Sequence, residues 1–219
     1  MTQDHPVEAV EALVIGAGPA GLMAAEQLGR AGVQVVIVDA MPSPARKFLM
    51  AGKSGLNLTK SEDIDDFLSH FSPCPPALKT AVEAFGPTEV SAWADSLGQP
   101  VFAGSTGRVF PKTMKASPLL RAWLARLDGY GVALRRRWRL IGFDKGVALF
   151  DTPDGERRIQ AKTRVLAMGG ASWARLGSNG VWAASMPPSR LAPFESANAA
   201  LSLSWSSHME RHFGSAVKG

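Results

Sequence analysis

Three glycines near the start of the chain have the spacing that most directly suggests chemistry. They lie in Gly16-Ala17-Gly18-Pro19-Ala20-Gly21, a Gly-x-Gly-x-x-Gly pattern between an apolar run and a stretch with helical spacing of apolar residues. In such a turn Gly16 permits a tight exit from a strand, Gly18 lets the backbone approach a pyrophosphate, and Gly21 lets the helix pack on the strands. The dipole at the helix N-terminus stabilises a bound anion by about 0.3–1 kcal/mol, in addition to any direct hydrogen bonds. This stretch therefore predicts a dinucleotide-binding turn.

An acidic residue completes this pattern at the end of the next apolar run. Asp39 follows Val33–Val38, about 20 residues after the turn, where a carboxylate can accept hydrogen bonds from both hydroxyls of a ribose. A charge-assisted bond of this kind contributes about 1.5–3 kcal/mol. The alternative is a glycine turn in an ordinary βαβ unit with an exposed aspartate.

Two cations and a glycine-containing segment follow Asp39. Arg46 and Lys47 are close enough in sequence to reach the phosphates of the same cofactor, although a pair of surface cations explains them nearly as well. Phe48–Thr59 interleaves apolar residues with glycines and small polar groups, a composition that lets backbone lie against a flat ligand. This segment, with Gly55 and Asn57, is a second candidate for cofactor contact.

The remaining pattern predicts the elements that position these groups. Residues 61–97 read as a helical excursion capped near Ser61–Asp63, with helices at about 76–85 and 87–97. A further helix is expected from Ser117 to Gly129. Three strand-like runs, at 132–142, 147–151 and 156–160, predict a three-stranded meander in place of the helical crossover of a nicotinamide dehydrogenase. We associate this arrangement with FAD-binding domains of the glutathione-reductase type.

The predicted sheet ends in a double glycine. Residues 163–168 read as a buried parallel strand that delivers Gly169 and Gly170 to the cofactor. Arg108, between a glycine and an apolar pair, is either a substrate or cofactor contact or an arginine at a hairpin end. Four arginines on the run 132–142 are expected to form a solvated edge: Arg135, Arg136, Arg137 and Arg139.

Composition narrows the class of protein. The 219 residues are 46% hydrophobic and 20% charged, as in globular proteins, and no apolar stretch is long enough to span a membrane. Residues 1–11 lack the basic region of a signal peptide. One cysteine, Cys74, excludes an intrachain disulfide and a redox-active pair, and fits a reducing cytoplasm. The net charge of +5 leaves RNA binding open beside ordinary solvated surface charge.

Other chemical sites are not evident in the sequence. His208 and His212 have helical i, i+4 spacing but lack a third ligand, so no metal site is predicted. No side chain is assigned to catalysis. A second Gly-x-Gly-x-x-Gly is absent from the sequence, so a nicotinamide donor would have to dock directly on a flavin.

Three stretches together resemble the NAD(P)/FAD-dependent oxidoreductases of the BaiN type, predicted flavoproteins of bacteria. They are Gly16–Gly21 with Asp39, Arg46–Thr59, and Ala167–Ser172 running on to Gly177-Ser178, and Gly107–Pro111 also fits. The resemblance implies non-covalent FAD, an NAD(P)H donor, a small organic substrate and a cytoplasmic location.

The resemblance also implies a role for each matching position. Gly16, Gly18, Gly21 and Asp39 would hold the ADP half of FAD, Arg46 and Lys47 the neighbouring phosphates, and Gly55, Asn57, Gly169 and Gly170 the flavin side. This chain has Leu56 where the family pattern has cysteine. Family members also continue through an inserted substrate domain to a final FAD-contacting segment, so the chain is expected to be truncated.

The sequence therefore predicts a doubly wound α/β fold of the FAD/NAD(P)-binding, Rossmann-like type. Residues 1–182 would form the FAD-binding domain, and residues 183–219 a linker and the start of an incomplete substrate domain. The expected function is transfer of hydride from NAD(P)H through flavin to an unknown organic substrate. The alternatives are a flavin-dependent RNA-modifying protein and a nucleotide-binding fragment without activity. A small molecule, and neither nucleic acid nor membrane, is the expected partner, and no oligomeric state is assigned.

Overall fold

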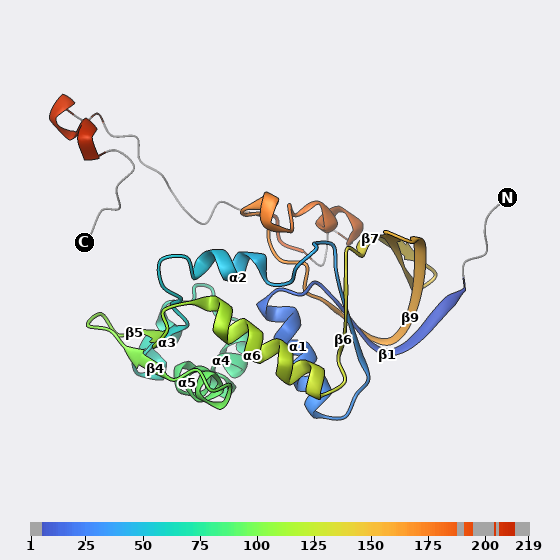
Figure 1. Ribbon diagram of the computed structural model, residues 1–219, viewed down its shortest axis with the longest axis horizontal. Helices are drawn as coiled ribbons and strands as arrows, with labels where there is room; N and C mark the ends of the chain where they lie inside the picture. Colours follow the sequence, from blue (N-terminus) through green and yellow to red (C-terminus); the bar gives the residue numbers. More distant parts are fainter. Residues whose placement is uncertain (1–5, 188–190, 195–203, 205, 213–219) are drawn as a thin grey trace.

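A computed structural model describes residues 6–187, 191–194, 204 and 206–212 (Figure 1). The strands are β1 (Val7–Ile15), β2 (Val35–Asp39), β3 (Thr59–Lys60), β4 (Val101–Ala103), β5 (Arg108–Pro111), β6 (Ala133–Arg136), β7 (Arg139–Asp144), β8 (Val147–Thr152) and β9 (Gly155–Leu166). The helices are α1 (Pro19–Arg30), α2 (Arg46–Ala51), α3 (Ile64–Ser69), α4 (Pro76–Ala84), α5 (Pro87–Ser96) and α6 (Ala116–Gly129). Short 3-10 helices follow: η1 (Ala174–Leu176), η2 (Val181–Ser185) and η4 (Ser207–His212).

The main sheet has the strand order β6-β2-β1-β9-β8-β7. Strands β6, β2, β1 and β9 run parallel, and β9, β8 and β7 form an antiparallel meander at the other side. Figure 1 shows the meander at one end of the molecule and the helical excursion at the other, with α1 and α6 between them. This is the mostly parallel, Rossmann-like α/β fold with a meander that the sequence predicts.

The parallel strands are packed against other elements on both faces, in agreement with their continuous apolar runs. Ala12, Val14 and Ile37 face the helix side, where Leu22 of α1 and Leu119 of α6 pack against them. The alternate residues of these strands pack against Ala148 and Phe150 of β8 on the opposite face. A strand segment buried on both faces needs apolar residues at every position, as residues 12–15 of β1 and 35–38 of β2 have.

The predicted strand at 132–142 is wrong, because the chain divides there into two strands. β6 pairs with β2 in parallel, whereas β7 begins at Arg139 and pairs with β8. Arg137 between them has a left-handed backbone, with φ of 60°. Trp138 N–H donates to the Asp39 carbonyl, at 2.9 Å, so the turn stays fixed to the end of β2. The meander therefore consists of β7, β8 and β9.

The four arginines of this region are only partly on a solvated edge. Arg136, Arg137 and Arg139 are exposed as expected. Arg135 instead donates two hydrogen bonds to Glu8 of β1, at 2.6 and 2.7 Å, and its guanidinium lies 4.8 Å from the centre of the Trp138 ring.

The second half of β9 is also more exposed than predicted. β8 pairs with β9 only as far as Ile159, so residues 160–166 have β1 as their one strand neighbour in the described part of the chain. Thr163 and Arg164 are exposed, and Leu166 keeps 40% of its surface accessible. A strand next to a single neighbour does not acquire the burial of a central strand.

The excursion between β2 and α6 contains the expected helices and a small sheet that was not expected. α4 and α5 match the predicted helices within one residue at each end, and Asp63 caps α3 by accepting a hydrogen bond from Asp65 N–H at 2.9 Å. β3, β5 and β4 form an antiparallel sheet in that order. α2 is a helix in a segment for which no helix was predicted. Gly52 ends it, and a side chain there would meet Ala116 of α6 at 2.6 Å.

The C-terminal part of the chain is described only in short segments. Residues 201–205, where alternating apolar and polar side chains favour a strand, lie outside the described residues apart from Ser204. Within the part that the structure describes, no helix combines the length and apolarity needed to cross a bilayer.

Candidate nucleotide-binding site

The glycine turn lies where β1 passes into α1, and two of its glycines are required by the fold itself. Gly16 has φ of 109°, its N–H donates to the Val38 carbonyl at 2.8 Å, and a Cβ there would lie 2.3 Å from the Ala167 carbonyl oxygen. A Cβ on Gly21 would lie 1.8 Å from the carbonyl oxygen of Gly16. Any side chain at either position would displace the turn.

Gly18 differs from both of these glycines. Its backbone is extended, with φ of −80° and ψ of −180°, a conformation open to any residue. A Cβ built on it meets no atom within 4 Å. The protein itself therefore does not require glycine at this position. The open space above Gly18, at the start of a 12-residue helix, fits a group that must come close to the backbone, such as a phosphate.

The N–H groups around this space are available to a ligand. Pro19 is the first residue of α1 and has no N–H, and the N–H groups of Gly18, Ala20 and Gly21 have no acceptor within the described residues. The first N–H groups of a helix are normally satisfied by a cap, by water or by a ligand. No side-chain cap is present at Gly18.

Asp39 lies beside the turn, as the sequence predicts, and also holds the turn in place. One carboxylate oxygen accepts a hydrogen bond from Ala17 N–H and the other from Met41 N–H, both at 2.7 Å. The Ala17 carbonyl in turn accepts from Ala45 N–H at 2.8 Å, and Ala17 is fully buried. Each carboxylate oxygen keeps a further lone pair with which it can accept from a ribose hydroxyl.

Arg46 and Lys47 begin α2 and have different surroundings. Lys47 Nζ donates to the carbonyls of Gly170 and Ser178, at 3.0 and 3.2 Å. Arg46 Nε is buried and has no hydrogen-bond partner in the described structure. Lys47 thus connects the first βαβ unit to the double glycine after β9, a contact between residues that are 123 positions apart.

The double glycine follows β9 and is held through its carbonyl groups. Gly169 has φ of 74°, and its carbonyl accepts a hydrogen bond from Trp182 Nε1 at 2.9 Å. Ser178 Oγ lies 3.4 Å from the same carbonyl. The N–H groups of Gly169 and Gly170 have no acceptor in the described chain. Sequence reasoning missed Trp182, because nothing in its spacing relates it to Gly169. It placed Ser178 in the same stretch as the double glycine but gave it no role.

Gly55 and Asn57 lie farther along the excursion, beside β5. Leu56 N–H donates to the Met114 carbonyl at 3.0 Å and Leu58 N–H to the Val109 carbonyl at 2.9 Å, so this segment runs along β5. Asn57 is exposed between these two bonds. Arg108, also exposed, lies opposite Lys60 in the pairing of β3 with β5.

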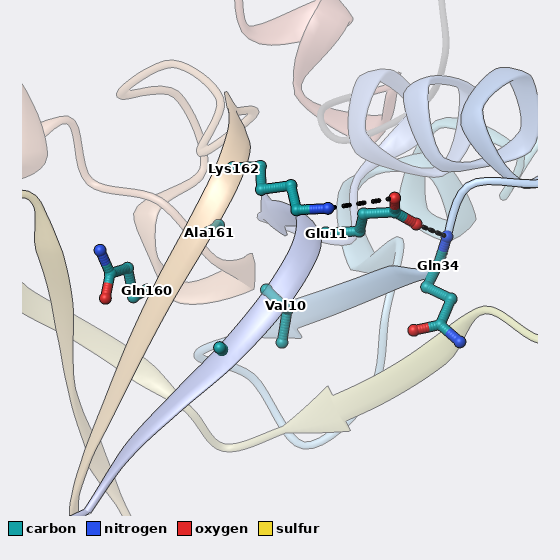
Figure 2. A pocket seen from close by; sticks show the side chains of 7 residues that line it. Val10, Glu11, Gln34, Gln160, Ala161 and Lys162 are labelled. Carbon is teal, nitrogen blue, oxygen red and sulfur yellow. Dashed lines mark hydrogen bonds and ion pairs between the residues drawn. The ribbon is translucent and has the colours of Figure 1, made fainter.

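Two open hollows lie elsewhere on the molecule. One is lined by Phe143, Gly146, Arg164 and Leu166. The other lies along β1 and β9 and is shown in Figure 2. There Glu11 accepts from Gln34 N–H at 3.1 Å and lies 3.6 Å from Lys162 Nζ, and the hydrogen bond followed by the lysine charge lowers the pKa of the Glu11 carboxyl. Neither hollow includes the glycine turn.

The fold and the groups around the turn thus define a class of protein: a Rossmann-like domain whose glycine turn leaves free N–H groups at a helix start, beside an aspartate at the end of the next strand. Comparison with protein families agrees with this assignment. Residues 10–188 match the family described as HI0933-like protein Rossmann domain, and the chain belongs to that family. That family is defined by its Rossmann domain, which agrees with the fold and the glycine turn described above.

Two curated relatives are similar to part of the chain. A ribosomal RNA dihydrouridine synthase of Escherichia coli K12 is 24% identical over 173 residues, which cover 79% of this chain and 42% of the relative. A ferredoxin–NADP reductase of Verminephrobacter eiseniae is 33% identical over 129 residues, 51% of this chain and 36% of the relative. The chain thus corresponds to less than half the length of either protein.

Solved structures agree with the fold. The open conformation of a flavocytochrome c3 fumarate reductase has a TM-score of 0.57 at 23% identity, covering 75% of this chain and 34% of that one. A 3-ketosteroid-Δ4-(5α)-dehydrogenase from Rhodococcus jostii RHA1 has a TM-score of 0.57 at 15% identity, covering 77% and 47%. At these identities the likeness concerns the fold alone.

Proposed function

We propose that this chain is the FAD-binding part of an oxidoreductase of the BaiN type, located in the cytoplasm, that uses NAD(P)H to reduce an organic substrate. The observation that carries the proposal is the free space at Gly18, bordered by unpaired N–H groups and by Asp39. The bound FAD would supply the redox chemistry by accepting hydride from the donor and passing it to the substrate.

The residues of the site have distinct tasks in this proposal. The N–H groups of Gly18, Ala20 and Gly21 bind the pyrophosphate, and Asp39 accepts hydrogen bonds from the ribose while it holds the turn. Arg46 supplies a cation whose Nε is unpaired. Lys47 holds the double glycine, which leaves the N–H groups of Gly169 and Gly170 to the flavin side. Gly55 and Asn57 are proposed for the flavin side as well.

The test is an anaerobic absorbance titration. The purified chain is saturated with FAD, separated from free FAD, and then mixed with NADH or with NADPH. The proposal predicts that the flavin band is retained and that at least one donor bleaches it. The donor that bleaches the band faster is the preferred nicotinamide donor. A chain that retains no flavin, or a flavin band that neither donor bleaches, would contradict the reductase proposal for this chain and favour a nucleotide-binding fragment without activity.

A second candidate is reduction of a base in RNA. Two observations favour it: the similarity to a ribosomal RNA dihydrouridine synthase over 79% of this chain, and the net charge of +5. A protein that neutralises phosphates binds RNA less tightly as salt increases. We therefore expect a gel shift with ribosomal RNA that weakens between 50 and 200 mM salt. Absence of a shift at low salt would remove this candidate.

A further inference from the structure

Trp173 has a backbone and an exposure that the fold does not explain. Its φ and ψ are 54° and 49°, a left-handed conformation that costs an L-residue about 1–2 kcal/mol. Its surface is 59% accessible, and no aromatic ring contacts it in the described part of the chain. Strained residues of this kind cluster at ligand-binding and active sites.

The segment that carries Trp173 is closed at its base. Lys47 Nζ donates to the carbonyls of both Gly170 and Ser178, so one ammonium group joins the two ends of the segment 170–178. Trp182 Nε1 holds the adjacent Gly169 carbonyl at 2.9 Å. The position of Trp173 is therefore fixed by contacts to α2 and to η2.

This segment lies at the edge of the sheet where the glycine turn is. Ala167 N–H donates to the Ile15 carbonyl at 2.8 Å, and the Ala167 carbonyl is the group that a Cβ on Gly16 would meet. Trp173 follows Ala167 by a few residues, beyond the double glycine. Trp173 thus lies in the loop after the carboxyl end of β9, and open α/β sheets bind their ligands at the carboxyl ends of their parallel strands.

A cation accompanies the indole. Arg175 is exposed in η1, two residues after Trp173, and makes no hydrogen bond or ion pair with the described residues. Exposed aromatic rings and free guanidinium groups on one segment are the groups with which proteins bind single-stranded nucleic acid: a ring stacks on a base and a cation contacts a phosphate.

We propose that Trp173 stacks on an unpaired base of RNA and that Arg175 contacts a phosphate of the same strand. This inference rests on the RNA-reducing candidate described above and assigns the residues that would hold its substrate.

The test measures binding of a fluorescein-labelled single-stranded oligouridylate to the FAD-saturated chain by fluorescence anisotropy. Stacking of one base corresponds to about a 5- to 150-fold effect on the dissociation constant, so Trp173→Ala should weaken binding by that factor. Trp173→Phe keeps an aromatic face and should restore most of the affinity. Arg175→Gln should lower the slope of log K against log salt by about 0.7. Val181→Ala, which removes an exposed apolar side chain from η2, is the matched control and should have no effect.

Several results would overturn the inference. One is that the wild-type chain and Trp173→Ala bind RNA with equal affinity. Another is that the wild-type chain does not bind oligouridylate at 50 mM salt. The third is that Trp173→Ala loses FAD but keeps its RNA affinity. The last result would place the indole against the flavin. FAD content is measured on the same samples. A chain that retains FAD but does not bind RNA contradicts this inference and leaves the reductase proposal intact.

Discussion

The glycines of the nucleotide turn differ in what a side chain would meet at each position. Gly18 has free space around its Cβ direction, whereas a Cβ on Gly21 would overlap the Gly16 carbonyl. We expect Gly18→Ala to keep the unfolding temperature of the free chain and to weaken FAD binding at least tenfold, because the methyl group occupies the space of the phosphate. Gly21→Ala should instead destabilise the free chain.

Thermal unfolding without ligand and an FAD titration separate the two effects. Gly129→Ala is the control, since that position is also open and is remote from the turn. Equal FAD affinity in Gly18→Ala and Gly129→Ala would contradict the assignment of the free space to a phosphate.

Asp39 is expected to act on the free protein as well as on the ligand. Its two oxygens accept from Ala17 N–H and Met41 N–H, and an amide in Asp39→Asn offers only one acceptor and turns an NH₂ group toward a donor. Loss of one such bond should lower the free energy of unfolding by about 1.5–3 kcal/mol, measured by urea denaturation without FAD. Asp154→Asn, in an exposed turn, is the control. An unchanged stability of Asp39→Asn would show that the carboxylate serves the ligand alone.

At the scale of elements, one buried carboxylate connects the Rossmann core to the excursion. Glu26 of α1 is 4% exposed and accepts from Arg126 of α6 at 3.0 Å and from Trp93 Nε1 of α5 at 3.1 Å. Arg126 also donates to the Ser96 carbonyl at 2.6 Å. Glu26→Ala leaves this guanidinium without its carboxylate and should lower stability by about 3–5 kcal/mol.

The paired replacement tests the reason for that loss. Glu26→Met combined with Arg126→Met removes both charges and should cost much less than the sum of the single replacements. Urea denaturation of the four proteins gives the coupling energy. Additive effects would mean that packing, and not the ion pair, accounts for the loss.

A second ion pair joins β1 to the edge strand β6. Arg135 donates both hydrogen bonds to Glu8, which lowers the pKa of Glu8 and raises the pKa of Arg135. Because the folded-state pKa of Glu8 lies below its unfolded value near 4.5, the stabilisation is present above that value and is lost as pH falls through the folded-state pKa. The pair is partly exposed, so its contribution should be about 0.2–1 kcal/mol.

Urea denaturation at pH 7 and pH 3 measures this contribution. Glu8→Gln should remove that part of the pH dependence and leave the stability at pH 3 near that of the wild-type chain. A stability difference between the two proteins that is the same at both pH values would contradict the linkage.

At the scale of the whole molecule, the features predicted correctly from the sequence are those that depend on steric constraints within a short stretch of chain. The glycine turn, Asp39 at the end of β2 and the helices α1, α4, α5 and α6 follow from spacing within short windows. The small β3-β5-β4 sheet was missed because its pairing joins Thr59 to Val109, and the Lys47–Gly170 contact was missed for the same reason. The split between β6 and β7 depends on the turn at Arg137, which an uninterrupted apolar and basic run does not reveal.

The measurement that tests the central claim most directly compares FAD with FMN. The glycine turn and Asp39 are assigned to the ADP half of the cofactor, which FMN lacks. We predict that calorimetric titration of the chain shows FAD binding and that ADP competes with FAD for the site. FMN should bind at least a hundredfold more weakly than FAD. Equal affinity for FAD and FMN, or FAD binding that ADP does not affect, would contradict the account.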